Sequence, residues 1–124
     1  MASNHLDYVA PVLRVANLDR SLAYYQERLG FELEFNYENF YASITRDGCR
    51  IHLSNAPPLP RDLAELRAED HIDACFGVHD IEALQDECKL HGANISTSLR
   101  SMPYGKEFYV QDPDGYLLAF VQPA

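Results

Sequence analysis

Side chains able to do chemistry are few in this 124-residue sequence, and they are loosely grouped. His71 and Asp73 stand close together in a β-rich run, so alternation along a strand places both on one face. An imidazole and a carboxylate in this arrangement can help to hold a divalent metal ion, or they can hydrogen-bond to each other or to a ligand. Cys75 follows on the same face, and we interpret it as a small buried thiol rather than a nucleophile.

Motifs for other common chemistry are missing from the sequence. No serine lies in a Gly-x-Ser-x-Gly sequence, and no glycine-rich loop is present that would hold a phosphate group. The cysteines Cys49, Cys75 and Cys88 are odd in number and lack C-x-x-C spacing. Together with the lack of a secretory leader, they indicate reduced thiols and a cytoplasmic protein.

The composition excludes several kinds of partner. The formal net charge is −9, with most of the acidity in the second half, so we expect no binding to nucleic acid or to anionic membranes. No apolar run is long enough to span a bilayer. We interpret the acidity first as a source of solubility, and second as an attraction for a cationic ligand.

The elements that would position these side chains form a pattern that occurs twice. A strand pattern over Leu13 to Val15 leads to Asn17, a favourable N-cap, and then to a helical pattern that ends at Gly30. Val78 to Glu82 repeats this passage from a strand through a capping side chain, Asp80, into a helix that closes at Gly92.

Each half also contains an Asp-Gly hairpin signal between β-rich runs, at Asp47-Gly48 and at Asp114-Gly115. Each half therefore reads as a strand, a helix and about three further strands. We expect a single domain with one module over about 7–54, a proline-bearing connector over 55–70 and a second module over 71–122. A short helix is expected over Asp62–Arg67 in the connector.

Two motifs carry a resemblance to a known family. The segment from Val12 to Tyr25, closed by Leu29-Gly30-Phe31, and the ending from Tyr104 to Gly115 resemble the vicinal-oxygen-chelate superfamily. This superfamily includes glyoxalase I, extradiol dioxygenases, and fosfomycin- and bleomycin-resistance proteins, and the ending is most similar to the bleomycin-resistance branch. The resemblance implies an α+β fold in which two βαβββ modules form a curved, open cup of sheet with the helices on the outside.

The resemblance also locates the positions that hold a metal ion in catalytic members, and they fall on Ala10, His52, Asp73 and Ala119. A methyl group has no lone pair to donate, so the usual metal centre is not expected and no cofactor is predicted. The alternative is a divergent glyoxalase-like lyase or dioxygenase in which His52, His71 and Asp73 surround a divalent ion.

Strand alternation separates a core face, which includes Leu13, Val15, Cys49, Ile51 and Leu53, from a cup face. On the last strand it assigns Leu118 and Phe120 to the core face, and Leu117, Ala119 and Val121 to the cup face. The tyrosines suit the cup because their rings can stack on a flat ligand while their hydroxyls stay hydrated. The resemblance implies ligand stacking at Tyr104, and Glu107 and Asp73 would then neutralise a cationic group on the ligand. The predicted ligand-binding residues are Tyr37, Phe40, Arg50, His52, Asp73, Tyr104, Glu107 and Tyr109.

The leading prediction is a non-catalytic protein that sequesters a small apolar or aromatic molecule, which can be cationic, as an antibiotic-resistance binding protein does. The resemblance implies a homodimer in which Met1 to Pro11 form an exchanged arm. A third reading is an inert or regulatory module whose cup binds a partner protein.

Overall fold

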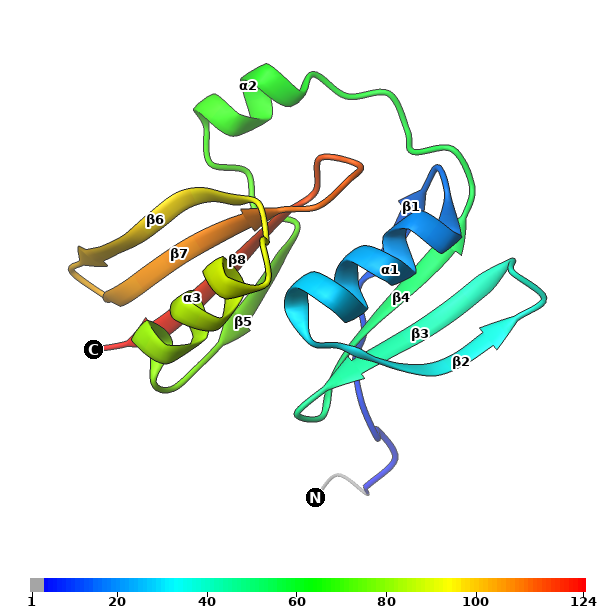
Figure 1. Ribbon diagram of the computed structural model, residues 1–124, viewed down its shortest axis with the longest axis horizontal. Helices are drawn as coiled ribbons and strands as arrows, with labels where there is room; N and C mark the ends of the chain where they lie inside the picture. The colour runs from blue at the N-terminus through cyan, green and yellow to red at the C-terminus, as the bar shows by residue number, and fades with distance from the viewer. Residues whose placement is uncertain (1–3) are drawn as a thin grey trace.

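A computed structural model describes residues 4–124 of the chain, and it contains two four-stranded sheets and three helices within that range (Figure 1). The first module comprises β1 (Val12–Val15), α1 (Leu18–Leu29), β2 (Glu32–Tyr37), β3 (Tyr41–Arg46) and β4 (Cys49–Asn55). The second comprises β5 (Ala74–Gly77), α3 (Ile81–Leu90), β6 (Ile95–Met102), β7 (Gly105–Gln111) and β8 (Leu117–Pro123). Between them lies α2 (Leu63–Ala68).

Both modules have the same topology. The strand orders are β1-β4-β3-β2 and β5-β8-β7-β6, with a parallel pair at β1/β4 and at β5/β8. Neither sheet closes on itself, and the two are not joined by strand pairing. The predicted α+β fold of two βαβββ modules is confirmed.

The first helix begins and ends where the sequence predicts. The Asn17 side chain accepts a hydrogen bond from the Arg20 N–H at 3.0 Å, and Gly30 ends the helix at φ +70°. That left-handed conformation is easily adopted only by glycine. Asp62 likewise caps α2 by accepting from the Glu65 N–H, as expected for the connector helix.

The predicted cap of the second module's helix is wrong. Asp80 lies at φ +53°, and its side chain makes no capping hydrogen bond. The Ile81 N–H instead donates to the Gln122 side-chain oxygen at 2.9 Å. A long-range contact from β8 thus satisfies the helix end that local sequence assigned to Asp80.

The two Asp-Gly turns differ in length. Asp47 and Gly48, at φ +52° and +80°, connect β3 and β4 as a tight two-residue hairpin. The second turn is wider, because the Asp112 side chain accepts hydrogen bonds from the N–H groups of Asp114 and Tyr116 and holds the loop open between β7 and β8.

One hydrophobic core joins the helix-facing sides of both modules. Leu13, Val15, Ile51 and Leu53 are buried there, as alternation predicts. Cys49, which was expected to pack beneath the helix, is exposed because it starts β4 beside the hairpin turn. Among residues 4–124, no helix combines the length and apolar character needed to cross a bilayer.

Candidate ligand-binding site

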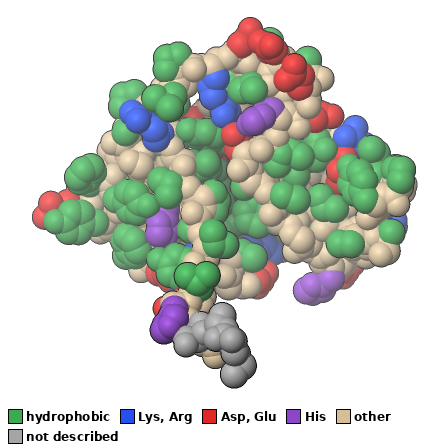
Figure 2. Space-filling view, turned by 180° about the vertical axis from the view of Figure 1, so that it is seen from behind, with side chains coloured by type: hydrophobic (Ala, Val, Ile, Leu, Met, Phe, Trp, Pro, Cys, Tyr) green, Lys and Arg blue, Asp and Glu red, His purple; other side chains and the backbone are tan. Residues whose placement is uncertain are grey.

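The faces of the two sheets that turn away from α1 and α3 carry the predicted site residues. Figure 1 shows both helices on the same side of the sheets, and Figure 2, from behind, shows hydrophobic side chains spread over both halves of the opposite side. The first sheet with its β2–β3 turn carries Tyr37, Phe40, Arg50 and His52, and the second with its flanking loops carries Asp73, Tyr104, Glu107 and Tyr109. We call these surfaces the first and second open faces.

An aromatic cluster surrounds His52 on the first open face. The ring centroids of Tyr8 and Phe35 lie 6.0 Å from the imidazole centroid, and that of Tyr41 lies at 5.4 Å. Tyr41 Oη and His52 Nδ1 are 2.9 Å apart, within hydrogen-bonding distance. The imidazole is therefore fixed in orientation by a neighbouring strand, because Tyr41 begins β3 and His52 lies in β4.

Arg50 lies beside this cluster and is fully engaged. Its guanidinium forms an ion pair with Glu34 at 3.1 Å and lies 4.2 Å from the centroid of the Tyr8 ring. Glu34 also accepts a hydrogen bond from Ser43, and these hydrogen bonds from Arg50 and Ser43 lower the pKa of its carboxyl group. The arginine contributes a stacked, neutralised surface rather than a free charge.

Tyr37 and Phe40 lie at the β2–β3 turn, and each is 61% exposed. Glu38 and Asn39 of this turn both adopt the left-handed conformation, at φ +50° and +56°. Asparagine is one of the residues that adopt it readily. The exposed rings extend the aromatic surface of the first open face.

Glu107 is buried at the centre of a polar cluster on the second open face. Only 1% of the residue is exposed. Arg100 lies 2.6 Å from its carboxylate and Tyr109 donates a hydrogen bond at 3.0 Å, while the Tyr104 hydroxyl donates to the other oxygen. A buried carboxylate is costly unless it is paired in this way.

The same contacts explain the acidities in this cluster. Burial opposes ionisation of Glu107, but the hydrogen bonds from Tyr104, Arg100 and Tyr109 outweigh it and lower its pKa. The hydrogen bond to Glu107, with burial, raises the pKa of Tyr104 to about 12. The cluster thus holds an ionised glutamate and neutral tyrosines near neutral pH.

Asp73 is likewise occupied. Arg61 donates to its two oxygens at 2.9 and 3.2 Å, and the Leu117 N–H donates at 2.9 Å. With Glu107 paired to Arg100, neither carboxylate offers the uncompensated charge that was expected to neutralise a cationic ligand. Neither arginine was among the predicted ligand-binding residues: Arg61 lies in the connector, and Arg100 lies opposite Glu107 on the neighbouring strand of the β6–β7 hairpin.

A small apolar patch borders the Glu107 cluster. Tyr109, Leu117 and Ala119 form a hydrophobic cluster separate from the main core, and Val121 packs against it. The alternation predicted for β8 is therefore correct: Leu117, Ala119 and Val121 share one face, and Leu118 and Phe120 belong to the core. Tyr109, Leu117 and Ala119 are all buried, so the part of this patch that faces solvent is the half-buried Val121 at its edge.

The metal positions of catalytic family members do not fit an ion here. Ala10 and Ala119 carry no donor atoms, the Asp73 carboxylate is held by Arg61, and His52 Nδ1 lies against Tyr41. His71 Nε2 lies 3.8 Å from Asp73, but His52 is on the other sheet. Among the described residues, no three His, Cys, Asp or Glu side chains come together in a way that could hold an ion.

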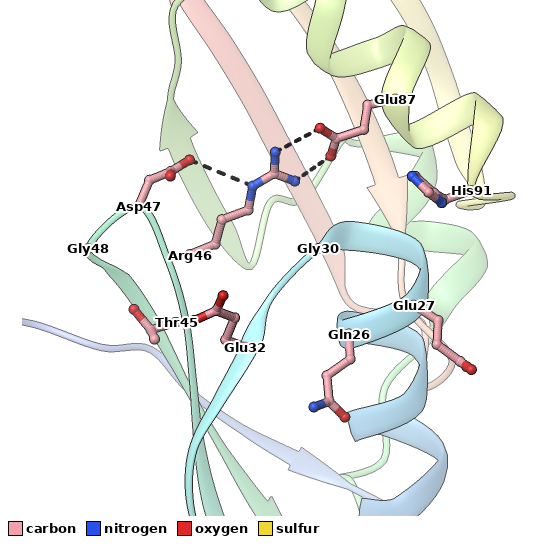
Figure 3. A pocket seen from close by; sticks show the side chains of 10 residues that line it. All are labelled: Gln26, Glu27, Gly30, Glu32, Thr45, Arg46, Asp47, Gly48, Glu87 and His91. Atoms are coloured by element: carbon pink, nitrogen blue, oxygen red, sulfur yellow. Dashed lines mark hydrogen bonds and ion pairs between the residues drawn. The ribbon is translucent and has the colours of Figure 1, made fainter.

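Two cavities lie elsewhere, at the seam between the modules. One of about 630 Å³ is mostly polar, and one of about 460 Å³ is bordered by Phe31, Phe76 and Phe120. Arg46, at the end of β3, lines both of them and forms an ion pair at 2.6 Å with Glu87 of α3 (Figure 3). None of the eight predicted ligand-binding residues lines either of these two cavities, so the candidate site lies apart from both.

The candidate site contains residues that were not among the predicted ligand-binding residues: Tyr8, Phe35 and Tyr41 beside His52, and Arg61 and Arg100 beside the two carboxylates. A usable signal existed for Arg100, because a hairpin closing at Pro103 places it opposite Glu107 across β6 and β7. Tyr8 and Arg61 lie outside the strands, where no periodicity predicts which side chain a residue will meet.

Comparison with known proteins identifies the class of this chain. Residues 4–120 match the model of the Glyoxalase/Bleomycin resistance protein/Dioxygenase superfamily, and the chain belongs to this family. A protein of Vibrio parahaemolyticus named probable lactoylglutathione lyase is 32% identical over 90% of this chain and 86% of its own length. The lactoylglutathione lyase of Haemophilus influenzae is 30% identical, over 90% and 88% respectively.

A solved structure shares the fold. The bleomycin-binding protein of Streptomyces verticillus, solved in complex with copper(II)-bleomycin, superposes with a TM-score of 0.70 at 23% identity, covering 97% of this chain and 100% of that one. The predicted family and its cup-forming architecture are therefore confirmed. Enzymes and binding proteins occur together among these matches, so the site itself has to distinguish them.

Proposed function

We propose that this protein binds and sequesters a small, flat, apolar or aromatic molecule without transforming it. One observation carries the proposal: the positions that hold a catalytic metal in the family are filled here by two alanines and by two side chains engaged in other contacts. What remains on the open faces is aromatic surface and neutralised polar groups, which suit recognition of a flat guest.

The charges on the open faces narrow the proposed guest. The carboxylates of Glu34, Asp73 and Glu107 are each paired with an arginine. A cationic guest would have to compete with those guanidinium groups, so a positive charge is not a requirement for binding. Stacking on the exposed rings of the first open face supplies most of the affinity, because Tyr109, Leu117 and Ala119 of the apolar patch are already buried.

We further propose a homodimer in which the first open face of one copy meets the second open face of the other. Val12, Phe35 and Tyr37 are 54%, 43% and 61% exposed, and Leu6 and Val9 of the preceding segment are 96% and 87% exposed. Apolar side chains gathered in this way indicate an interaction surface. The predicted arm spans Met1 to Pro11, of which residues 1–3 lie outside the described part.

The chemistry of the cysteines supports a reducing compartment for the protein. Cys49, Cys75 and Cys88 are all free thiols; the first two are exposed, so the interpretation of Cys75 as a buried thiol is wrong. We therefore retain the proposal of a cytoplasmic location.

Titration with planar compounds tests the proposed function. The chain has 8 tyrosines and no tryptophan, so its intrinsic fluorescence reports on the aromatic faces. A panel of polycyclic antibiotics, acridines and phenazines is expected to contain binders with Kd in the micromolar range, at about −8 kcal/mol. Replacement of Phe35 by Ala is expected to weaken binding about tenfold, whereas Leu59→Ala, an exposed residue of the connector, leaves it unchanged.

Failure of every compound to bind below about millimolar concentration would count against sequestration. Equal weakening by Phe35→Ala and Leu59→Ala would place the guest elsewhere than on the first open face.

The similarity to a lactoylglutathione lyase and to a probable lactoylglutathione lyase favours a second candidate function, a metal-dependent lyase. Its test is direct: the protein is loaded with Zn²⁺ or Ni²⁺, dialysed and analysed for metal, and lactoylglutathione lyase activity is assayed in parallel. Sequestration predicts neither stoichiometric metal nor turnover. One retained ion per chain together with turnover would establish the lyase instead.

A further inference from the structure

His52 Nε2 is unusual on the first open face because it is buried yet makes no hydrogen bond. Within residues 4–124, it is the one buried side-chain nitrogen or oxygen without a partner. Buried polar atoms are almost always paired, and leaving one unpaired costs free energy. An unpaired atom of this kind in the middle of a candidate ligand surface points to a group that arrives with the ligand.

The other ring nitrogen determines what His52 Nε2 can do. Nδ1 lies 2.9 Å from Tyr41 Oη. A phenolic hydroxyl is a strong donor, and the unprotonated nitrogen of a neutral imidazole is a better acceptor than a phenolic oxygen. Tyr41 therefore donates to Nδ1, which leaves the imidazole proton on Nε2. His52 presents an N–H donor to the first open face.

The surroundings of His52 define the shape of the missing partner. The rings of Tyr8, Phe35 and Tyr41 lie around the imidazole, and Arg50 is engaged by Glu34. No neighbouring acceptor reaches Nε2. The Nε2–H group can therefore donate one hydrogen bond to an acceptor atom that enters the aromatic cluster.

Access to Nε2 requires one of these rings to move. Phe35 and Tyr41 are held in β2 and β3, whereas Tyr8 precedes β1, lies outside any strand and is 52% exposed. Its ring rests on Arg50 at 4.2 Å. Of the three rings, Tyr8 is therefore the one that the sheet does not hold, and its place over the guanidinium is the position that a flat guest would take.

We propose that His52 Nε2–H donates a hydrogen bond to an acceptor oxygen, such as a carbonyl or quinone oxygen, on a flat aromatic guest. This inference rests on the proposed function and specifies its ligand class. It makes His52 the residue that selects among flat compounds by their oxygen acceptors, because a guest without one leaves the buried N–H unpaired.

Two probes of matched shape test the selection. 2-Acetylnaphthalene carries a carbonyl oxygen, and 2-isopropenylnaphthalene replaces that oxygen by a CH₂ group. In chemical-shift titrations of the ¹⁵N-labelled protein, the ketone is expected to bind about tenfold more tightly than the alkene. His52→Phe, which keeps a flat ring in the cluster, is expected to abolish this preference. His79→Phe, the same substitution at an exposed site on the helix side, is expected to retain it.

The same labelled protein gives a readout independent of binding. Long-range ¹H–¹⁵N correlations of the imidazole are expected to show the proton of free His52 on Nε2, and Tyr41→Phe is expected to shift the tautomer population. A proton found on Nδ1 in the wild-type protein would overturn the inference, whatever the probes do.

The binding outcomes separate the two proposals. Equal affinity for ketone and alkene, or a preference that survives in His52→Phe, overturns the role of His52 and leaves sequestration intact. If neither probe binds, the His52 inference fails for this ligand class, and the fluorescence panel decides separately on sequestration.

Discussion

The Asp112 carboxylate ties the β7–β8 turn to α1. It accepts a hydrogen bond from the Tyr25 hydroxyl at 2.8 Å in addition to those from the turn, and the residue is 4% exposed. Burial raises the pKa of Asp112 from 3.8 to about 6, although the hydrogen bonds from Tyr25, Tyr116 and Asp114 act in the opposite direction. Asp112 is thus mostly ionised at neutral pH, and burial of its charge lowers the stability of the folded chain.

This acidity gives a prediction with a definite sign. Because the pKa of Asp112 is higher in the folded chain than in the unfolded chain, its contribution to stability is present below pH 4 and is lost as the pH rises to about 6. Asp112→Asn removes this dependence. Between pH 7 and pH 4, the free energy of unfolding of the wild type is expected to gain about 2 kcal/mol relative to the variant.

Urea denaturation of both proteins across this pH range measures the difference. The other carboxylates are common to both proteins, so their titration cancels. A difference that does not change with pH would show that Asp112 is not buried as described.

The pH dependence of stability that Glu107 contributes has the opposite sign to that of Asp112. Because the pKa of Glu107 is lowered in the folded chain, its stabilisation is lost as the pH falls below the usual range of a glutamate. Glu107→Gln removes the charge that holds Tyr104, so the pKa of Tyr104 is expected to fall from about 12 toward its ordinary value. The variant is expected to lose about 2 kcal/mol of stability at pH 7. Tyrosinate absorbance during alkaline titration measures the shift, and Tyr104→Phe identifies the transition that belongs to this residue.

The candidate site shows what sequence can and cannot predict at the residue scale. Alternation correctly placed His52, Leu117 and Ala119 on the faces they occupy. It could not show that Arg61 pairs with Asp73, because Arg61 lies outside the strands and meets Asp73 only through the tertiary fold, whereas the β6–β7 hairpin register would have placed Arg100 opposite Glu107. The expected anionic surface is therefore a set of neutral pairs.

At the scale of elements, local capping and turn rules succeeded where the contacts are local. Asn17, Gly30 and the Asp47-Gly48 turn perform the predicted roles. The cap predicted at Asp80 is wrong, because the Gln122 side chain, near the end of the chain, accepts the hydrogen bond from the Ile81 N–H at the start of α3. Sequence rules describe hydrogen bonds within a few residues, and this one spans the second module.

Gly105 at the start of β7 gives a prediction for an element. It lies at φ +140°, and a Cβ atom placed there would clash with the Gln122 carbonyl oxygen and lie 2.9 Å from backbone atoms of Pro123 and Ala124. The backbone of a hydrogen-bonded strand can move away from such a contact only by breaking its pairing with β7. Gly105→Ala is therefore expected to destabilise the protein by more than about 2 kcal/mol.

Gly77→Ala is the matched control, because its Cβ would meet nothing within 4 Å. Thermal unfolding is expected to show a large decrease in Tm for Gly105→Ala and little change for Gly77→Ala. Similar effects of the two substitutions would contradict the close pairing of β7 with the end of β8.

At the scale of the whole molecule, the exposed apolar segment before β1 predicts assembly. Leu6 and Val9 are almost fully exposed and contribute nothing to the core. Replacing both by Ser is expected to weaken the proposed homodimer while leaving monomer stability nearly unchanged, because side chains already in solvent lose no burial. Light scattering coupled to size-exclusion chromatography measures the mass. A monomeric wild type, or a variant that remains fully dimeric, would contradict this role for the segment.

The placement of His52 and Tyr104 on different sheets has a consequence for complementation. In the proposed homodimer, a chain carrying His52→Phe can pair with a chain carrying Tyr104→Ala. One ligand cleft of this mixed dimer then contains both substitutions, and the other cleft contains neither. Unfolding and refolding an equal mixture should restore wild-type affinity in about a quarter of all clefts, whereas neither parent alone restores any. Clefts built within a single chain would show no such rescue.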